Sequence, residues 1–416
     1  MKKELVIIAG SCYPINSATG GLALKCAEYL DDFYNIRLIA IQEGDNFACG
    51  RTYRNVKVYT LSHWRLRWAQ KSEELIYNSE GKKKLFYKIS NKLARGIGRV
   101  QSAFFTLDNM SWFTKKAYDC LIALNEDIPI DVILSFNMPI EAHFAAERFK
   151  TSFSKVRWVS YWGDLFANKP MKLNLFISIE KMRKIQKRLL TKSDEVLCTQ
   201  EIYDELSNGL ETDATPINAV PYVMKQAVLE EDCTNHNKSD GIINFVYMGA
   251  FYRDIRNPEK MLRIFSETPR TYRLHMYSSG NCDDIVDRFI RSNPDKFIKH
   301  EQVSSGELQK ILSNADVLVN IENSISNANP SKLIELISYR KPIVDFNYTN
   351  TPVPLLARYP LSANINVNNI GNAMLEIEKL IKKSKNLSIG KDEIIQLYFD
   401  NTEDKARMIV VSTVHD

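Results

Sequence analysis

Short apolar runs alternate with segments of helical periodicity along the whole chain of 416 residues. The apolar runs are continuous, which is typical of parallel strands that are buried on both faces. In the first half we expect strands at 5–9, 36–41, 55–61, 131–136, 156–161 and 194–198, and helices at 22–30, 112–125, 140–149 and 177–192. This order predicts an α/β domain with a parallel sheet covered by helices.

The same alternation resumes after residue 240. We expect strands at 242–248, 272–277, 297–300, 317–321 and 342–346, and helices at 261–266, 284–292, 306–313 and 333–339. The stretch between the halves is polar and carries turn-forming residues, so we place a linker at 216–240. The sequence therefore predicts two Rossmann-like, doubly wound domains at 1–215 and 241–390, followed by a helical segment at 391–416.

Composition adds limits to this picture. Apolar residues make up 44% of the chain and charged residues 25%, the balance of a globular protein with ample core. No apolar run approaches the ~20 residues of a membrane span, and the N-terminal run is too short for a signal peptide, so we expect a cytoplasmic protein. A net charge of +5 does not argue for a nucleic-acid partner. The histidines show no metal-ligand spacing, and the seven cysteines include no Cys-x-x-Cys pair, which favours reduced thiols.

Basic residues gather in two runs in the first half. From Arg65 to Arg99 there are ten basic residues against three acidic ones, and from Lys181 to Lys192 there are six basic residues. Either run alone is typical of a solvated helix face. Together they also fit attachment to an anionic membrane surface, where each Lys or Arg adds roughly 1 kcal/mol. Both interpretations stay open, and the second would make the protein peripheral on the inner face of the membrane.

The most informative chemistry follows the predicted strand at 317–321. The loop and the helix after it carry Asn329, Pro330, Ser331, Lys332, Leu333 and Glu335. A Ser hydroxyl, backbone N–H groups and a Lys at a helix N-terminus form a site for anions such as phosphate. A carboxylate slightly further into the helix can accept hydrogen bonds from sugar hydroxyls. One site could thus hold both halves of a nucleotide sugar.

Two strand ends in the second half add phosphate-binding residue types. Gly249 follows the strand at 242–248 and permits close approach of a phosphate, and Arg253 and Arg256 come soon after it. Either arginine could hold a diphosphate by bidentate hydrogen bonds. Ser278 and Gly280 follow the strand at 272–277 in the same way.

Strand ends in the first half carry a second set of candidates. Gly20 and Gly21 lie between the first strand and its helix, but without the Gly-x-Gly-x-x-Gly spacing of a dinucleotide site. Asp164 and Trp162 lie at the end of the strand at 156–161, and Asn137 follows the strand at 131–136. An aspartate after a strand is also a common turn or cap residue, so a structural role for Asp164 stays open.

These motifs, in this order, resemble the GT-B fold of retaining glycosyltransferases. The resemblance is to glycosyltransferase family 4, which is related to glycogen and sucrose synthases and whose bacterial members build surface polysaccharides. It implies that the C-terminal helix at 391–416 returns to the first domain. It also implies a UDP- or GDP-sugar as the sugar donor, with no cofactor and no metal ion, because cationic side chains would stabilise the leaving diphosphate.

The resemblance assigns a role to each position. The expected catalytic residues are Asp164, Gly21, Arg253 and Lys332. The expected donor-binding residues are Gly20, Gly249, Arg256, Ser278, Gly280, Asn327, Asn329, Pro330, Ser331, Leu333 and Glu335. Asn137 and Trp162 are expected on the acceptor side.

One position departs from the family pattern. Many members have two glutamates eight positions apart; Glu335 fits the second, but Asn327 stands at the first and Glu322 is out of register.

The expected function is transfer of a hexose from a nucleotide sugar to a glycan acceptor. The acceptor is expected to be lipid-linked, and the reaction to belong to the assembly of capsule, O-antigen or exopolysaccharide. Two alternatives stay open: a non-catalytic protein of the same fold that binds a nucleotide sugar or a partner transferase, and a nucleotide-sugar epimerase.

Overall fold

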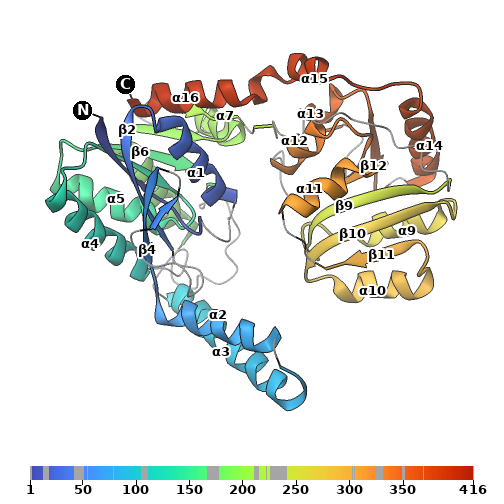
Figure 1. Ribbon diagram of the computed structural model, residues 1–416, viewed down its shortest axis with the longest axis horizontal. Coiled ribbons are helices and arrows are strands. Elements are labelled where there is room, and N and C mark those ends of the chain that lie inside the picture. Colours follow the sequence, from blue (N-terminus) through green and yellow to red (C-terminus); the bar gives the residue numbers. More distant parts are fainter. Residues whose placement is uncertain are drawn as a thin grey trace. The chain divides into compact units, whose positions relative to one another are not determined.

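The protein folds into two compact units, as shown in a computed structural model (Figure 1). The structure describes residues 2–12, 18–41, 51–53, 55–77, 79–104, 111–165, 178–209, 215–221, 223–224, 241–301, 303, 305–323, 331–348, 352–368 and 370–415. The first unit comprises Met1–Val220 together with Arg407–Asp416, and the second comprises Pro221–Ala406.

The first unit is built on a sheet with eight described strands in the order β3-β4-β2-β1-β5-β6-β7-β8. These strands are β1 (Lys3–Ile8), β2 (Tyr34–Ile41), β3 (Arg51–Tyr53), β4 (Val56–Leu61), β5 (Val132–Phe136), β6 (Arg157–Trp162), β7 (Glu195–Cys198) and β8 (Ile217–Ala219). The described pairs are parallel except for the antiparallel edge pair β3–β4. β1 and β5 are buried along almost their whole length, as continuous apolar runs require.

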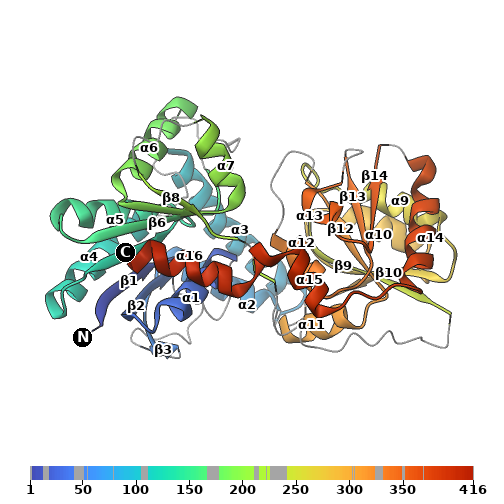
Figure 2. The same ribbon diagram turned by 90° about the horizontal axis from the view of Figure 1, so that it is seen from above.

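Helices cover both faces of this sheet. They are α1 (Ala18–Leu30), α2 (Trp64–Tyr77), α3 (Gly81–Phe104), α4 (Ser111–Asp127), α5 (Glu141–Ser152), α6 (Ile179–Lys192), α7 (Gln200–Gly209) and, from the end of the chain, α16 (Glu403–His415). The helices α4, α5 and α6 pack on one face, in a core that includes Val6, Ile133 and Trp158. The helices α1 and α16 lie on the opposite face (Figure 2).

The second unit has a sheet of six described strands in the order β11-β10-β9-β12-β13-β14, all parallel. The strands are β9 (Ile243–Phe251), β10 (Tyr272–Gly280), β11 (Phe297–His300), β12 (Val317–Ile321), β13 (Ile343–Asn347) and β14 (Ser362–Asn366). The helices are α9 (Glu259–Glu267), α10 (Asp283–Ser292), α11 (Ser305–Ser313), α12 (Ser331–Ser338), α13 (Pro354–Ala357), α14 (Ala373–Ser384) and α15 (Lys391–Leu397). Two short 3-10 helices are Ile370–Asn372 and Phe399–Asn401. The helices α9, α10 and α14 lie on one face, and α11 and α12 on the other (Figures 1 and 2).

The predicted order of strands and helices is confirmed, and the differences are local. Each predicted strand and helix overlaps an observed one. The predicted linker at 216–240 begins too early, because Ile217–Ala219 forms β8 and pairs with β7. The last segment divides differently too: α15 belongs to the second unit, and only Arg407–Asp416 belongs to the first.

The C-terminal helix is tied to the first unit by both polar and apolar contacts. The Tyr34 hydroxyl donates to the carbonyl of Val414 at 2.9 Å, and Arg157 donates to the carbonyl of Thr413 at 2.8 Å. Val410 and Val414 are fully buried. The first unit is therefore completed by residues from the far end of the chain.

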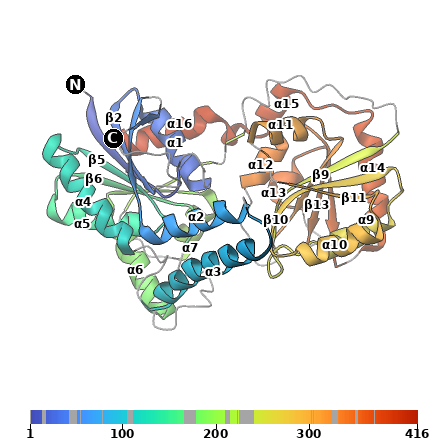
Figure 3. The same cartoon turned by 60° about the horizontal axis from the view of Figure 1, so that its bottom comes forward.

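The helices α2 and α3 form a hairpin that projects from the first unit after β4 (Figures 1 and 3). They lie side by side over much of their length (Figure 3). None of the helices in the described parts of the chain is both long enough and apolar enough to cross a bilayer.

Candidate functional site

The second sheet reverses its strand order between β9 and β12, which are neighbours in the sheet. The helix after β9 (α9) and the helix after β12 (α12) lie on opposite faces of the sheet, which is the topology of a switch point. In open α/β sheets ligands bind at this position. Apart from Gly20, the predicted donor-binding residues belong to the second unit, so we describe the side chains at this edge first.

Gly249, near the end of β9, brings the backbone against a lysine. Its φ angle is +151°, a conformation that side-chain-bearing residues rarely adopt. A Cβ atom at this position would lie 2.7 Å from Lys332 Nζ and 2.9 Å from the Tyr247 hydroxyl. The backbone conformation therefore favours glycine here, and the Lys332 ammonium group lies directly beside the end of β9.

Lys332 comes from the first turn of α12 and is partly buried. Its Nζ atom donates to the carbonyl of Met248 at 3.1 Å. The pKa of Lys332 is lowered from 10.5 to about 8 by burial and by the positive charge of Arg256, and Glu335 opposes this shift. An ammonium group held near a second cation is stabilised by a bound anion, because the anion screens the repulsion between the two charges.

Arg256 is the second cation of this cluster. Its Nε atom donates to the side-chain oxygen of Asn323, just past β12, at 3.1 Å. Burial raises the pKa of the Tyr247 hydroxyl, and the nearby positive charge of Arg256 opposes this rise. The Arg256 side chain thus reaches from the loop after β9 to the end of β12, across the point where the strand order reverses.

A buried network of amides and carboxyl groups lies at the ends of β12 and β13. The Asn320 amide donates to Glu322 at 2.8 Å and to Asp345 at 2.7 Å, and Asn347 donates to the other Asp345 oxygen at 3.2 Å. The pKa of Asp345 is raised to about 7 by burial and by the nearby Glu322, and the hydrogen bonds from Asn320 and Asn347 oppose this rise. Burial also raises the pKa of Glu322, which Asn320 and Arg256 oppose.

The end of β10 lies next to Gly249. Ser278 is paired with Gly249 in the register of the sheet, and Gly280 is paired with Phe251. A Cβ atom at Gly280, whose φ angle is +118°, would lie 1.9 Å from the carbonyl oxygen of Phe251. The glycine at 280 thus allows close packing of two strand ends, and Ser278 is brought to the same edge as Gly249.

The helix α12 starts at Ser331, two residues before the predicted start at 333, and extends for eight residues. Leu333 is fully buried in the second core, so only its backbone could face a ligand. Glu335 lies three positions after Lys332 and is partly buried. The predicted contacts of Asn327, Asn329, Pro330 and the Ser331 side chain lie outside the described residues.

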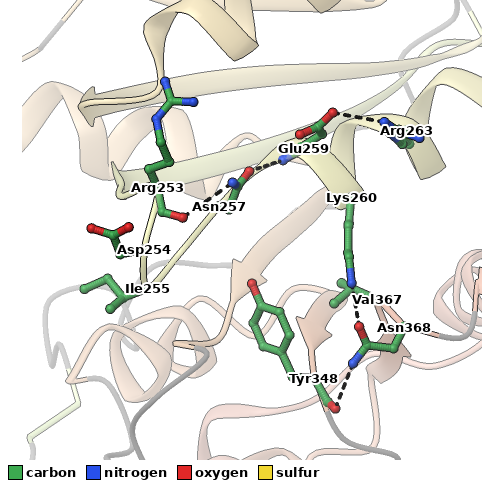
Figure 4. A pocket seen from close by; sticks show the side chains of 10 residues that line it. All are labelled: Arg253, Asp254, Ile255, Asn257, Glu259, Lys260, Arg263, Tyr348, Val367 and Asn368. Atoms are coloured by element: carbon green, nitrogen blue, oxygen red, sulfur yellow. Dashed lines mark hydrogen bonds and ion pairs between the residues drawn. The ribbon is translucent and has the colours of Figure 1, made fainter.

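Arg253 points to a different place from Arg256. Its guanidinium pairs with Asp284, at the start of α10, at 2.6 Å. It also lines a cavity of about 630 Å³ beside α9, together with Asp254, Ile255, Asn257, Glu259, Lys260, Arg263, Tyr348, Val367 and Asn368 (Figure 4). None of the residues lining this cavity is Gly249, Arg256 or Lys332. The structure therefore separates the two arginines that the sequence left as equal candidates.

In the first unit the strand order reverses between β1 and β5, and Asn137 lies just after β5. Asn137 is 5% exposed. Its amide donates to the carbonyl of Asp164 at 2.6 Å, and its side-chain oxygen accepts from the backbone N–H of Gly163 at 3.1 Å. Asn137 therefore holds the loop that presents Asp164 at the carboxyl edge, and both hydrogen-bonding ends of its amide are occupied.

Trp162 does not fit its predicted acceptor role. Its side chain is fully buried, and its indole N–H donates to the Ser160 hydroxyl at 2.9 Å. Its ring also packs against His143, with ring centroids 4.6 Å apart. The expectation of an acceptor contact through this side chain was wrong, because Trp162 faces the core side of β6.

The two glycines near the N-terminus lie inside α1, not in a loop before it. A Cβ atom at Gly20 would lie 2.0 Å from the carbonyl oxygen of Ser11, whereas nothing lies within 4 Å of one at Gly21. Gly20 is thus required for packing of the helix against the loop after β1. Only Gly21 has open space for a ligand beside it.

Sequence reasoning missed Tyr247, Asn320 and Asp345 as members of this site. Each lies inside a strand that reads as an apolar run, so a polar residue there is a signal of its own: buried polar side chains need partners. Asn320 and Asp345 are adjacent in the register of β12 and β13. A search for polar residues within the predicted buried strands would have found them.

Comparisons with known proteins agree with this architecture. The sequence matches no protein-family model, and no similar sequence was found among curated proteins. Among solved structures, sucrose-phosphate synthase from Thermosynechococcus elongatus is 10% identical with a TM-score of 0.61, covering 99% of this chain and 95% of that chain. An alpha,alpha-trehalose-phosphate synthase (UDP-forming) from Burkholderia vietnamiensis is 10% identical with a TM-score of 0.62, covering 100% and 98%.

A third similar structure is WaaG, a glycosyltransferase involved in lipopolysaccharide biosynthesis. It is 9% identical to this chain with a TM-score of 0.58, and the match covers 99% of this chain and all of that chain. These proteins share the GT-B fold, and the likeness extends over both units of the chain. The GT-B fold predicted from the sequence is confirmed.

Proposed function

We propose that this protein is a retaining glycosyltransferase that takes its sugar from a nucleotide diphosphate sugar. The observation that carries the proposal is the convergence of Arg256 and Lys332 beside the backbone of Gly249, at the point where the strand order reverses. Two neighbouring cations, one of them beside a glycine backbone, suit a diphosphate, since each charge-assisted hydrogen bond is worth roughly 1.5–3 kcal/mol. The structural neighbours with this fold include a UDP-forming trehalose-phosphate synthase and a glycosyltransferase involved in lipopolysaccharide biosynthesis.

The roles of the residues follow from this placement. Arg256, Lys332 and the N-terminus of α12 stabilise the diphosphate as it leaves, which needs no metal ion. The bond between the anomeric carbon and the phosphate oxygen breaks, the acceptor oxygen bonds to the same carbon, and its proton passes to the leaving phosphate. Glu335 accepts hydrogen bonds from the ribose. Asp164, on the loop held by Asn137, contacts the sugar or the acceptor.

The acceptor we propose is a lipid-linked glycan of a bacterial surface polysaccharide. The basic run from Arg65 to Arg99 supports a location at the inner face of the membrane, because it would attract anionic lipids. The second run, from Lys181 to Lys192, supports it less. In α6, Arg188 and Lys192 both pair with Glu147, and Lys184 pairs with Glu180. These cations already have carboxylate partners.

A thermal-shift screen against UDP, GDP, ADP, TDP and CMP, and their common sugar conjugates, tests the donor site. A ligand at a hundred times its dissociation constant adds ~2.7 kcal/mol to the stability of the state that binds it. We expect one nucleoside diphosphate to raise the midpoint, with Arg256→Ala and Lys332→Ala each weakening its binding by ~10-fold or more. A folded protein whose unfolding midpoint is raised by no nucleotide or sugar conjugate of the panel would contradict the donor-site proposal.

A paired substitution decides between the two arginines. Arg253→Ala breaks the ion pair with Asp284, and Arg256→Ala breaks the contacts with Asn323 and Tyr247. We expect Arg256→Ala to lose nucleotide affinity and Arg253→Ala to keep it.

An assay for slow hydrolysis of the nucleotide sugar without acceptor then separates an active transferase from a protein that only binds the nucleotide sugar. Binding without any turnover would favour the non-catalytic alternative.

A further inference from the structure

The outer helix of the α2–α3 hairpin presents a stripe of large apolar side chains to solvent. The apolar stripe consists of Leu85, Phe86, Ile89, Leu93 and Ile97, whose exposed fractions lie between 37% and 67%. Most of them are four positions apart, which places them along one side of α3. A contiguous apolar surface of this kind marks an interaction site, because water does not favour it.

The buried side of α3 is the polar one. Ala94 is fully buried, and Asn91, at 7% exposure, donates to a backbone carbonyl of α2 at 3.3 Å. The Ser90 hydroxyl accepts from the indole N–H of Trp68 at 2.9 Å and lies 3.0 Å from the Ser72 hydroxyl. Hydrogen bonds and small side chains thus hold α3 to α2. Each side chain of the apolar stripe remains more than a third exposed despite that packing.

The charge of α3 indicates the kind of partner. The segment Gly81–Phe104 contains seven basic residues and no acidic one. Its five lysines are all exposed: Lys82, Lys83, Lys84, Lys88 and Lys92. At about 100° of rotation per residue, Lys88 and Lys92 lie beside the apolar stripe. An apolar stripe bordered by lysines is complementary to the surface of an anionic bilayer, where apolar groups enter and ammonium groups stay at the headgroups.

The other basic helix lacks this arrangement. In α6 the apolar side chains Met182, Leu189 and Leu190 are buried in the core of the first unit, and several cations pair with carboxylates. Of these two basic helices, α3 is the one that combines an exposed apolar side with a sequence free of acidic residues. The hairpin also follows the carboxyl end of β4, which is the same edge of the first sheet at which β5 and β6 end near Asn137 and Asp164.

We propose that α3 inserts its apolar stripe into the headgroup region of an anionic lipid membrane. The carboxyl edge of the first sheet, with Asp164, then lies toward the lipid surface. The inference rests on the proposed function for one point only, that a lipid-linked acceptor would present its glycan at this edge. The binding itself depends on the side chains of α3 and can be tested without any sugar donor.

Flotation with vesicles tests the insertion. The full chain is mixed with vesicles of phosphatidylcholine, with or without phosphatidylglycerol, at low and high salt. We expect binding to the vesicles that contain phosphatidylglycerol. Phe86→Ser/Leu93→Ser should lower the partition coefficient about tenfold or more, because two exposed apolar groups no longer enter the bilayer. Lys88→Glu/Lys92→Glu should lower it about 25-fold, at roughly fivefold for each lysine removed.

A matched control comes from the second unit. Leu375 on α14 is 50% exposed, close to the value for Ile89, so Leu375→Ser removes a comparable apolar side chain from another surface. It should leave vesicle binding unchanged. All of these positions are exposed, so each variant should retain the unfolding midpoint of the wild-type protein.

The depth of α3 is measured with a fluorescent side chain. Phe86→Trp should be quenched by lipids brominated in their acyl chains, and Leu375→Trp should not. Either of two results would overturn the proposal: absence of binding to anionic vesicles, or equal binding by the wild type and Phe86→Ser/Leu93→Ser. Light scattering could give a third such result. A concentration-dependent dimer that is lost in Phe86→Ser/Leu93→Ser, in a protein that binds no vesicles, would assign the apolar stripe to contact with a second copy of the chain.

Thermal shift with nucleotides on the same samples, without lipid, keeps the two proposals apart. A protein that binds a nucleotide but no vesicle retains the donor site and loses the membrane proposal. A protein that binds vesicles through α3 but no nucleotide retains the membrane proposal and loses the glycosyltransferase one.

Discussion

In the second unit, the protonation state of Lys332 should determine how well the candidate site binds an anion. Its ammonium group lies beside the Gly249 backbone and near Arg256, and burial lowers its pKa to about 8. A diphosphate would favour the charged form, so affinity should be steady below pH 8 and fall as the pH rises above it. The sign follows because deprotonation removes one of the two cations.

Measured between about pH 7 and 9.5, nucleotide affinity should decline by up to ~10-fold for each pH unit above the pKa of Lys332. Lys332→Arg should abolish the decline, because the guanidinium keeps its charge throughout this range. The measurement is calorimetric titration with the nucleotide found in the screen. An unchanged affinity at pH 9 in the wild-type protein would show that Lys332 does not contact the anion.

Asp345 predicts a pH dependence of stability. Its pKa is raised by burial and by Glu322 to about 7 in the folded protein, against ~3.9 in an unfolded chain. The folded state therefore holds the proton more tightly. The stability that protonated Asp345 contributes is present below pH ~4 and is lost as the pH rises through 7, because ionisation of the buried carboxyl group then opposes folding.

Asp345→Asn should remove this part of the pH dependence, worth roughly 2–4 kcal/mol over that range. Urea unfolding of both proteins at several pH values measures it, with Asp295→Asn, an exposed carboxyl group, as the matched control. If the wild type and Asp345→Asn lose stability in parallel between pH 4 and 7, the Asp345–Glu322 pair does not hold the proton.

At the scale of elements, α1 offers a direct comparison between two neighbouring glycines. Gly20→Ala should destabilise the first unit by about 1–3 kcal/mol, because its Cβ would meet the carbonyl oxygen of Ser11. Gly21→Ala should leave stability equal or up to ~1 kcal/mol higher, since alanine favours the helix. Thermal unfolding measures both.

The same pair tests the predicted catalytic role of Gly21. Because Gly21→Ala is expected to fold, any loss of transferase or donor-hydrolysis activity in it reports a methyl group placed against the substrate. Unchanged activity would mean that the open space beside Gly21 is not used by the reacting sugar.

Much of the fold could be predicted because buried parallel strands leave a strong signal. The fully buried strand Val317–Ile321, for example, starts and ends where the sequence predicted it. Short edge strands leave little: β8 has three residues and lies in a polar stretch, and β14 reads Ser-Ala-Asn-Ile-Asn. The α2–α3 hairpin was equally hard to predict, because its apolar side faces solvent and its polar side faces its partner helix.

The candidate site was predictable in part. The start of α12 and the position of Lys332 followed from a strand and a helix signal next to each other. The choice between Arg253 and Arg256 needed tertiary contacts, since Asp284 and Asn323 lie far away in the sequence. Whether a strand residue such as Trp162 faces the core or a ligand depends on the pleat, and a buried run with apolar residues on both faces gives no indication.

At the scale of the whole molecule, the first unit depends on the end of the chain. A protein ending at Ala406 would lose the buried side chains of Val410 and Val414 and the hydrogen bonds from Tyr34 and Arg157. We expect the first unit to unfold at a lower temperature, by more than ~3 kcal/mol of stability. Nucleotide binding should persist, because Gly249, Arg256 and Lys332 belong to the second unit.

Calorimetry resolves this, as the truncated protein should show an early transition that does not respond to nucleotide and a later one that does. Val414→Ala is the milder variant, at about 1–2 kcal/mol. Met408→Ser is its control on the same helix, at a side chain that is 58% exposed. A truncated protein with a wild-type first transition would show that α16 contributes nothing to the first unit.

The return of α16 to the first unit also sets an order of events during translation. Residues 221–406 leave the ribosome before residues 407–415, so the second unit has its whole sequence available while the first still lacks its last helix. During this interval the nascent first unit exposes the apolar surface that α16 later covers, beside β2, the strand that carries Tyr34. Chaperones that bind exposed apolar surface would bind the first unit during that interval, which ends when residues 407–415 have been synthesised.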